Sequence, residues 1–164
     1  MKTLYVVRHA KSSWDNPGLN DFDRPLNDRG EKDAPRMGKR LKECDIKPEI
    51  IYSSPAVRAF STAQSIAQAL DIPLTQIKTE KRLYHASEET LLDVLKHSAE
   101  TADCVMLVGH NPGLTEFVND LLDEDIDNIP TTGVVMAQLP IHDWKDARWK
   151  CGNLLLFDYP KRKK

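Results

Sequence analysis

The sequence is poor in cysteine, and its cysteines lie far apart. Three occur among 164 residues, at Cys44, Cys104 and Cys151. They are odd in number and lack the short spacings of a disulfide framework. Widely spaced thiols are typical of a reducing compartment, so we expect a cytoplasmic protein.

Long hydrophobic runs are also missing. No stretch approaches the ~20 apolar residues that cross a bilayer, and the apolar residues after Lys2 are too few for a signal peptide. The net charge is -2 at pH 7, which gives no overall attraction to nucleic acid or to an anionic membrane. We expect neither as a partner. Any anion site must therefore come from local clustering of cations.

Familiar catalytic motifs are absent as well. The sequence contains no Walker-type glycine loop, no dinucleotide fingerprint and no G-x-S-x-G serine elbow. No cysteine is followed by an arginine in the manner of a cysteine-based phosphatase, and the five histidines show no zinc-ligand spacing. A nucleophile, if there is one, has to be sought elsewhere.

The sequence does contain alternating strand and helix patterns. Short apolar runs predict strands at 4–7, 50–52, 104–108, 133–139 and 153–159, with an extended piece at 74–78. Apolar residues at three- and four-residue spacing predict helices at 28–43, 56–70, 88–97 and 114–122. This alternation predicts an α/β fold, a three-layer αβα sandwich around a mostly parallel sheet. We expect one domain over 1–160, a final antiparallel hairpin, and a solvated basic tail at 161–164.

Basic and imidazole side chains collect where three predicted strands end. Arg8 and His9 follow the first strand, Arg58 lies in the first turn of the helix after the second, and His110 follows the fourth. Ligands of such sheets bind beyond the carboxyl ends of the strands, so these side chains are expected in one crevice. Guanidinium groups match phosphate oxygens in pairs. A phosphate site is therefore the leading interpretation.

Each of these residues also has a simpler interpretation on its own. Arg8 and His9 could decorate the surface, Arg58 could pair with a carboxylate, and His110 could cap a helix. Their occurrence at one level of the sheet favours a functional site. We expect no metal, because the two arginines would repel a cation beside His9. With serine and cysteine motifs missing, His9 is the expected nucleophile.

The segments RHA, SSPAVRA and GHNP, in this order and strand context, resemble the histidine phosphatase superfamily (branch 1, phosphoglycerate mutase-like). The stretches RHAKSSWDNPGLNDFDRPLNDRG and LYHAS, with no large cap insertion, resemble its SixA-like phosphohistidine phosphatases. The resemblance implies that His9 accepts the phosphoryl group as a phosphohistidine intermediate. It also implies that Arg8, Arg58 and His110 surround the phosphoryl oxygens. No metal or organic cofactor is implied.

Two departures from the family pattern bear on the substrate. The family's RHG is RHA here, with Ala10, which we interpret as a subfamily mark. Relatives that cleave phosphoesters carry a glutamate acid after the third strand; here Tyr84 or His85 takes that position, and Glu88 begins a predicted helix. An alkoxide needs a proton to leave, whereas imidazole is protonated near neutral pH. The sequence thus favours phosphohistidine on a protein as substrate. The alternatives are a phosphomonoesterase for small metabolites, in which Glu88 supplies the proton, and a non-catalytic phosphate-binding module.

The substrate side of the predicted site is less defined. Ser12 and Asp15 follow the RHA motif, and Thr132 opens a strand at the same edge, so all three are candidate substrate-binding residues. The pair Asp23 and Arg24 either lines the site or fixes the loop, and the polar loop at 15–25 could cover the pocket. We expect a monomer that acts on a phosphohistidine-bearing protein or a small phosphorylated molecule.

Overall fold

A computed structural model describes residues 1–45 and 47–162, and within them the chain forms one six-stranded sheet of order β3-β2-β4-β1-β5-β6. Its strands are β1 (Lys2–Arg8), β2 (Ile50–Ser53), β3 (Ile77–Thr79), β4 (Cys104–Gly109), β5 (Val134–Leu139) and β6 (Asn153–Asp158). The first four are parallel, and β5 and β6 form an antiparallel hairpin beside β1. The mostly parallel sheet and the hairpin are confirmed. Lys163 and Lys164 of the predicted tail lie outside the described residues.

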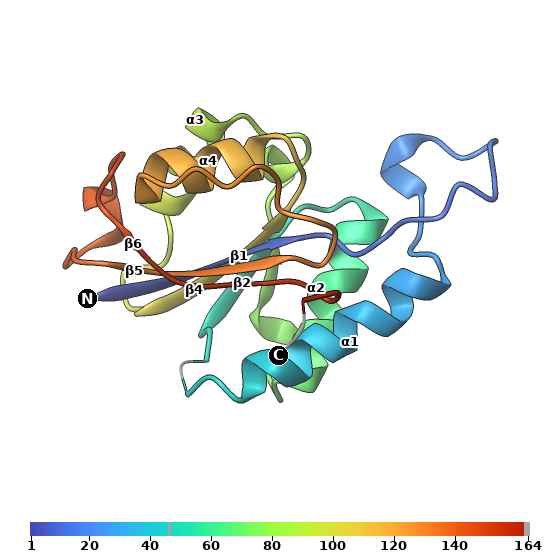
Figure 1. Ribbon diagram of the computed structural model, residues 1–164, viewed down its shortest axis with the longest axis horizontal. Helices are drawn as coiled ribbons and strands as arrows, with labels where there is room; N and C mark the ends of the chain where they lie inside the picture. The colour runs from blue at the N-terminus through green and yellow to red at the C-terminus, as the bar shows by residue number, and fades with distance from the viewer. Residues whose placement is uncertain (46, 163–164) are drawn as a thin grey trace.

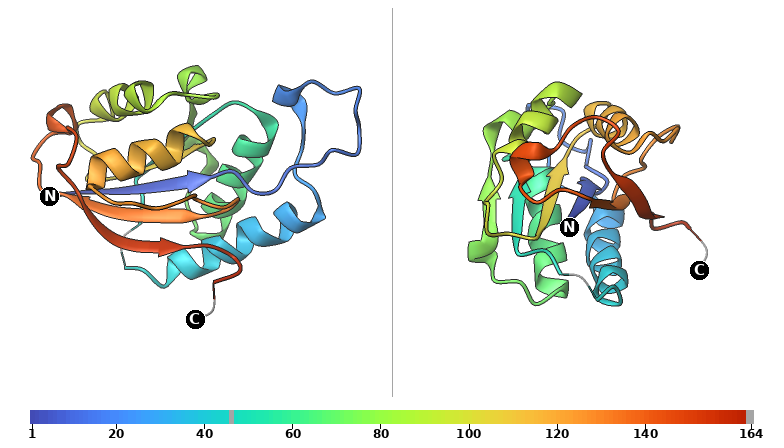
Figure 2. Two further views of the ribbon diagram at one scale, coloured as in Figure 1. Left: turned by 45° about the horizontal axis from the view of Figure 1, so that its top comes forward. Right: turned by 90° about the vertical axis from the view of Figure 1, so that its left-hand side faces the viewer.

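Helices cover both faces of the sheet (Figure 1; Figure 2). They are α1 (Asp28–Lys42), α2 (Val57–Ala69), α3 (Glu88–Lys96) and α4 (Gly113–Leu122). Because side chains alternate along a strand, β1 contributes to both cores: Tyr5 and Val7 pack on the α1–α2 side, and Leu4 and Val6 on the α3–α4 side. The predicted three-layer sandwich is confirmed.

Polar side chains cap the starts of α1 and α3. The Asn27 side chain accepts a hydrogen bond from the Gly30 N–H at 2.8 Å, and the Ser87 hydroxyl accepts one from the Thr90 N–H at 3.3 Å. Polar caps of this kind satisfy N–H groups that have no partner in the helix. The predicted extended piece at 74–78 is confirmed at 77–78, which belong to β3, and is wrong at Leu74–Gln76, which form a 3-10 turn. Proline at position 73 presets the backbone for a turn.

The three strands that carry the predicted site residues are neighbours in the sheet. Arg8 of β1 is in register with Gly109 of β4, and Ser53 of β2 with Val108 of β4. All three strands therefore end at the same edge, and the segment 11–27 between β1 and α1 projects beyond that edge (Figure 1; Figure 2). In the described ranges, no helix has the length and apolar character needed to cross a bilayer.

Candidate active site

His9 lies immediately after β1 and is fixed through its own backbone. Its N–H donates to the Gly109 carbonyl, and its carbonyl accepts from the Thr132 N–H, both at 3.1 Å. Its ring Nδ1 lies 2.7 Å from the Ala10 carbonyl oxygen. A carbonyl only accepts hydrogen bonds, so Nδ1 carries the hydrogen and Nε2 keeps its lone pair. This is the tautomer that a nucleophilic imidazole requires.

The surroundings of His9 keep the ring neutral. Burial lowers the pKa of His9 to about 4, and the positive charges of Arg58, Arg8 and Arg24 act in the same direction, against the hydrogen bond to Ala10. At neutral pH the ring is therefore uncharged, with Nε2 ready to attack an electrophile. Cations placed nearby also attract the anion that would be attacked.

Thr62 of α2 connects the His9 segment to Arg58. Its hydroxyl oxygen accepts a hydrogen bond from the Ala10 N–H at 2.8 Å and donates to the Arg58 carbonyl at 2.7 Å. Ala10 is fully buried and packs with Leu26 and Ala34. The nucleophile segment and the first turn of α2 are thus held together by one side chain.

Arg58 and His110 form the next part of the site. Arg58 is 2% exposed, and its Nη2 donates to Nδ1 of His110 at 3.3 Å. His110 in turn donates from Nε2 to the Ser54 hydroxyl at 2.8 Å. Burial lowers the pKa of His110 to about 3, and the positive charge of Arg58 acts in the same direction. The rings of His9 and His110 lie 5.1 Å apart between centroids, so two neutral imidazoles share the pocket with a buried guanidinium.

Arg8 completes the predicted set of four. Its Nη1 donates to the Ile129 carbonyl at 3.0 Å, while its buried Nε has no partner among the described residues. Burial lowers the pKa of Arg8. A half-buried guanidinium with an unmatched N–H favours the arrival of an anion.

Asp21 is the site residue that sequence reasoning missed. Its Oδ2 accepts from Arg58 Nη2 at 2.9 Å, from the Tyr84 hydroxyl at 2.6 Å and from His85 Nε2 at 3.0 Å, and its Oδ1 accepts from Arg24 Nη2 at 3.0 Å. Burial acts to raise the pKa of Asp21, but these hydrogen bonds outweigh it and hold the pKa well below its usual range. The Asp21 carboxylate is therefore hydrogen-bonded to Arg58, the arginine predicted to bind phosphate. The spacing Asp21-x-x-Arg24 could have indicated the pairing of Asp21 with Arg24, but not its contact with Arg58.

Arg24 organises the segment that leads from β1 to α1. It is 8% exposed; its Nη1 donates to the Ser12 hydroxyl at 2.7 Å, and its guanidinium lies 3.6 Å from the centroid of the Trp14 ring. Arg24 therefore both fixes the loop and lines the pocket, which answers the alternative left open by the sequence. Asp23 is exposed.

The remaining predicted residues are distributed in and around the pocket. Ser12 lines it, while Asp15 is exposed and outside it. Thr132 is fully buried and bonds through its N–H to the backbone; its neighbour Thr131 lines the pocket. His85 lines the pocket directly, and the Tyr84 hydroxyl donates a hydrogen bond to the pocket residue Asp21.

Glu88 lies away from the pocket, at the start of α3. A hydrogen bond with Asp120 of α4, together with burial, raises the pKa of Glu88 to about 7. The glutamate is thus protonated over part of the neutral range, and Asp120, which interacts with it, belongs to α4. Glu88 is not among the residues that line the pocket.

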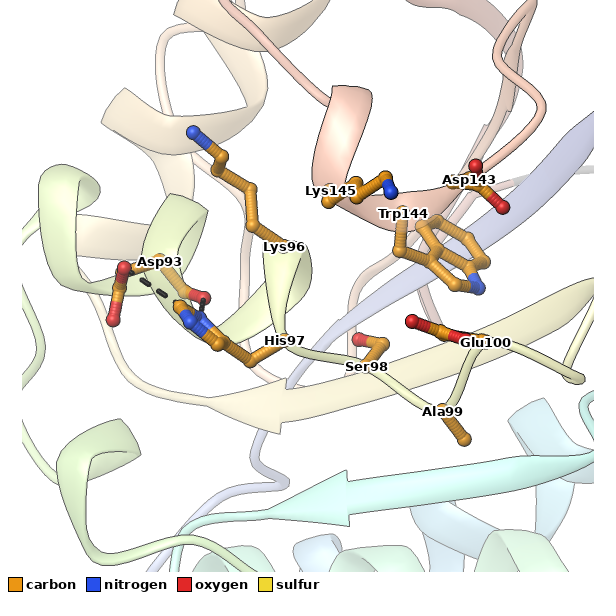
Figure 3. A pocket seen from close by; sticks show the side chains of 9 residues that line it. All are labelled: Asp93, Lys96, His97, Ser98, Ala99, Glu100, Asp143, Trp144 and Lys145. Carbon is orange, nitrogen blue, oxygen red and sulfur yellow. Dashed lines mark hydrogen bonds and ion pairs between the residues drawn. The ribbon is translucent and has the colours of Figure 1, made fainter.

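The catalytic pocket, which His9, Arg58 and Asp21 line together with their neighbours, is a cavity of about 310 Å³ at the carboxyl edge of the sheet. A larger cavity, about 650 Å³, is lined by Asp93 and by residues 96–100 and 143–145 (Figure 3). It lies before β4, at the opposite edge, and its histidine, His97, is exposed and bonded to Asp93. Among the described residues, no group of three or more His, Cys, Asp or Glu is arranged to hold a metal ion.

Comparison with known proteins places this geometry in a family. Residues 4–85 match the model of the histidine phosphatase superfamily (branch 1). The chain belongs to the histidine phosphatase superfamily. It is 30% identical to an uncharacterized chloroplastic protein of Arabidopsis thaliana, over 89% of this chain and 70% of that protein. A solved structure from Agrobacterium tumefaciens, assigned as the phosphohistidine phosphatase SixA, superposes with a TM-score of 0.83 at 29% identity, covering 97% of this chain and 98% of the other.

The superfamily also contains enzymes with other activities. A 2,3-bisphosphoglycerate-dependent phosphoglycerate mutase from Thermobifida fusca is 33% identical over 51% of this chain, but only 34% of the mutase is covered. The likeness to the SixA-assigned structure, by contrast, spans nearly the whole of both chains. As a member of this phosphatase family, the chain is a hydrolase, and the neutral His9 among arginines is the group suited to accept a phosphoryl group.

Proposed function

We propose that this histidine phosphatase removes phosphate from phosphohistidine on a protein. The observation that carries the proposal is the pairing of a neutral His9, its Nε2 lone pair available, with a pocket whose carboxylate, Asp21, is far too acidic to donate a proton. Among the described residues, the pocket thus offers a nucleophile for phosphorus but no carboxylic acid that could protonate an alkoxide leaving group. The likeness to a SixA-assigned protein supports the same substrate class.

The proposed reaction has two steps. Nε2 of His9 attacks phosphorus, the P–N bond to the substrate imidazole breaks, and the imidazole, protonated on its other nitrogen, leaves as a neutral ring. Water then attacks the phosphohistidine formed on His9, giving inorganic phosphate and restoring the imidazole. Arg8 and Arg58 bind the phosphoryl oxygens in both steps, so catalysis rests mainly on positioning and charge.

A small phosphoester is the second candidate substrate. His85 lines the pocket beside Asp21, and an imidazole at this place could protonate an alkoxide. The partial likeness to a phosphoglycerate mutase supports this alternative. Glu88 is poorly suited to the role, because it faces Asp120.

One experiment separates these substrates. The protein is incubated with a phosphohistidine-carrying protein domain and with a panel of phosphoesters, as wild type and as His9→Ala, with His97→Ala as the matched control at an exposed histidine. We expect the protein substrate to be turned over faster, no turnover by His9→Ala, and an acid-labile phosphoryl-enzyme in the wild type and the His97→Ala control but not in His9→Ala. Faster turnover of phosphoesters, lost in His85→Gln, would establish the second candidate instead. Turnover by His9→Ala would remove His9 from the mechanism.

The biological setting is also part of the proposal. We expect a cytoplasmic monomer with one domain over 1–160, on the basis of the widely spaced cysteines and the lack of a cap insertion. The non-catalytic phosphate-binding module is disfavoured, because such a module would not need His9 in its nucleophilic tautomer.

A further inference from the structure

A second cavity, about 240 Å³, adjoins the catalytic pocket. Lys11 and Thr131 line both cavities, so the two cavities lie side by side. The second cavity is completed by Arg29 and Asp33 of α1 and by Lys161, which follows β6. Three elements that are distant in sequence thus bring cationic side chains next to the phosphate site.

The backbone that carries these cations is fixed. A Cβ on Gly30 would lie 2.2 Å from the Lys11 carbonyl oxygen, so Lys11 is held directly against the first turn of α1. On the other side, Arg40 of α1 donates from Nη1 to the Tyr159 carbonyl at 2.9 Å and from Nη2 to the Pro160 carbonyl at 3.1 Å. These bonds anchor the segment that carries Lys161. The backbone on two sides of the cavity is therefore held in place.

The charge of this cavity is positive. Arg29 pairs through Nε with Asp33 Oδ2 at 3.2 Å, and Asp33 is 5% exposed. Lys11 and Lys161 form no ion pair within the described ranges 1–45 and 47–162. Asp33 is therefore one acid among three cations. The ammonium groups of Lys11 and Lys161 keep their full attraction for an anion.

We propose that the Lys11–Arg29–Lys161 cavity is a second anion subsite, which binds a carboxylate or phosphate that the substrate carries near its reacting phosphoryl group. This inference rests on the proposed phosphatase function and extends it to substrate choice. In a phosphohistidine protein the anion is an acidic side chain beside the phosphorylated histidine. In a metabolite it is a second acidic group. Tyr159 and Pro160 also line the cavity and add apolar contact area for the larger substrate, the protein.

The test compares a double variant with a control of equal charge. Arg29→Gln/Lys161→Gln removes two cations from the subsite. Arg36→Gln/Lys78→Gln removes two exposed cations that do not line it, and Arg36 lies on the same helix near Asp33, at 3.9 Å. Two phosphohistidine peptides serve as substrates, with glutamate or with glutamine beside the histidine.

We expect wild type to prefer the acidic peptide through a lower KM. In the subsite variant the ratio of the two KM values should fall roughly tenfold, because two partly exposed ion pairs with the substrate are removed. The control should retain the wild-type ratio. Equal loss in both variants would show a general effect of charge and overturn the subsite. Absence of any preference in wild type would do the same.

Failure of the subsite and failure of the proposed function give different results. If the peptides are not hydrolysed but phosphoesters are, the protein substrate is wrong, and the same variants are assayed with singly and doubly anionic phosphoesters. A preference for doubly anionic esters, lost in the subsite variant alone, would keep the subsite and name a metabolite as its source. Calorimetric binding of a phosphonate analogue of the acidic peptide gives a readout that needs no turnover. Equal affinity for wild type and subsite variant would overturn the proposal.

Discussion

The Asp21 carboxylate lies where an incoming phosphoryl group would also find its partners. It accepts hydrogen bonds from Arg58 and Arg24, and its charge is retained over the whole neutral range because its pKa is held low. An incoming phosphate therefore has to share the hydrogen bonds of Arg58 and Arg24 with Asp21, or replace Asp21 as their acceptor. An acid in an anion pocket thus weakens anion binding while it holds the loop to the catalytic arginine.

Asp21→Asn should therefore tighten the binding of inorganic phosphate. The amide keeps the shape of the side chain but removes both its charge and its hold on Arg58. We expect the competitive inhibition constant of phosphate to fall about tenfold, as charge-assisted hydrogen bonds contribute ~1.5–3 kcal/mol. Inhibition assays on Asp21→Asn and on Asp23→Asn, an exposed acid two residues along, measure the effect. An unchanged or larger constant for Asp21→Asn alone would show that Asp21 does not compete with phosphate.

At the scale of elements, the site depends on how closely α1 approaches the end of β1. Gly30 lies in the first turn of α1, and an added Cβ would meet the Lys11 carbonyl oxygen at 2.2 Å and the Lys11 nitrogen at 3.0 Å. Both neighbours are backbone atoms next to the His9 segment, so they cannot rotate away. The spacing between helix and strand end therefore requires glycine here.

Gly30→Ala tests this spacing. Helix propensity alone predicts that alanine stabilises an α-helix by up to about 1 kcal/mol relative to glycine. The close approach predicts the opposite, a loss of about 1–3 kcal/mol from overpacking and a lower kcat as the His9 segment shifts. Urea unfolding and turnover of Gly30→Ala are compared with Gly18→Ala, which is in an exposed turn. Stabilisation of both variants would show that α1 can move without cost.

The same elements show what could be predicted from the sequence. Arg8, Arg58 and His110 could be placed together because parallel strands end at one edge, whatever the details of packing. Asp21 could not, because the segment 11–27 has no hydrophobic period and its position is set by tertiary hydrogen bonds to Arg58 and Tyr84. Glu88 was identified correctly as the start of a helix, but its direction toward Asp120 depends on α4 packing beside α3.

At the scale of the whole molecule, the fold buries two imidazoles in neutral form. His9 and His110 have pKa values lowered to about 4 and about 3, each chiefly by burial, whereas histidine in an unfolded chain titrates near 6.5. Below that pH the unfolded chain binds protons that the folded chain does not. The stability that comes from these rings is therefore complete above about pH 6.5 and is lost as the pH falls toward 4. The catalytic pocket thus makes the whole fold sensitive to acid.

This linkage predicts a slope in unfolding free energy between pH 6.5 and 4. Each histidine contributes up to about 1.4 kcal/mol per pH unit, and His110→Gln should remove its share. Glu88 acts in the opposite sense: its pKa is raised to about 7, so its contribution is present at low pH and is lost as the pH rises from about 4.5 to 7. Asp21, with its low pKa, contributes to the slope only near and below pH 4. The free energy of unfolding is measured with urea at steps of half a pH unit for wild type and His110→Gln. Because Glu88 is present in both proteins, the difference between them isolates the contribution of His110. Parallel curves of unfolding free energy against pH would show that His110 is not buried in neutral form.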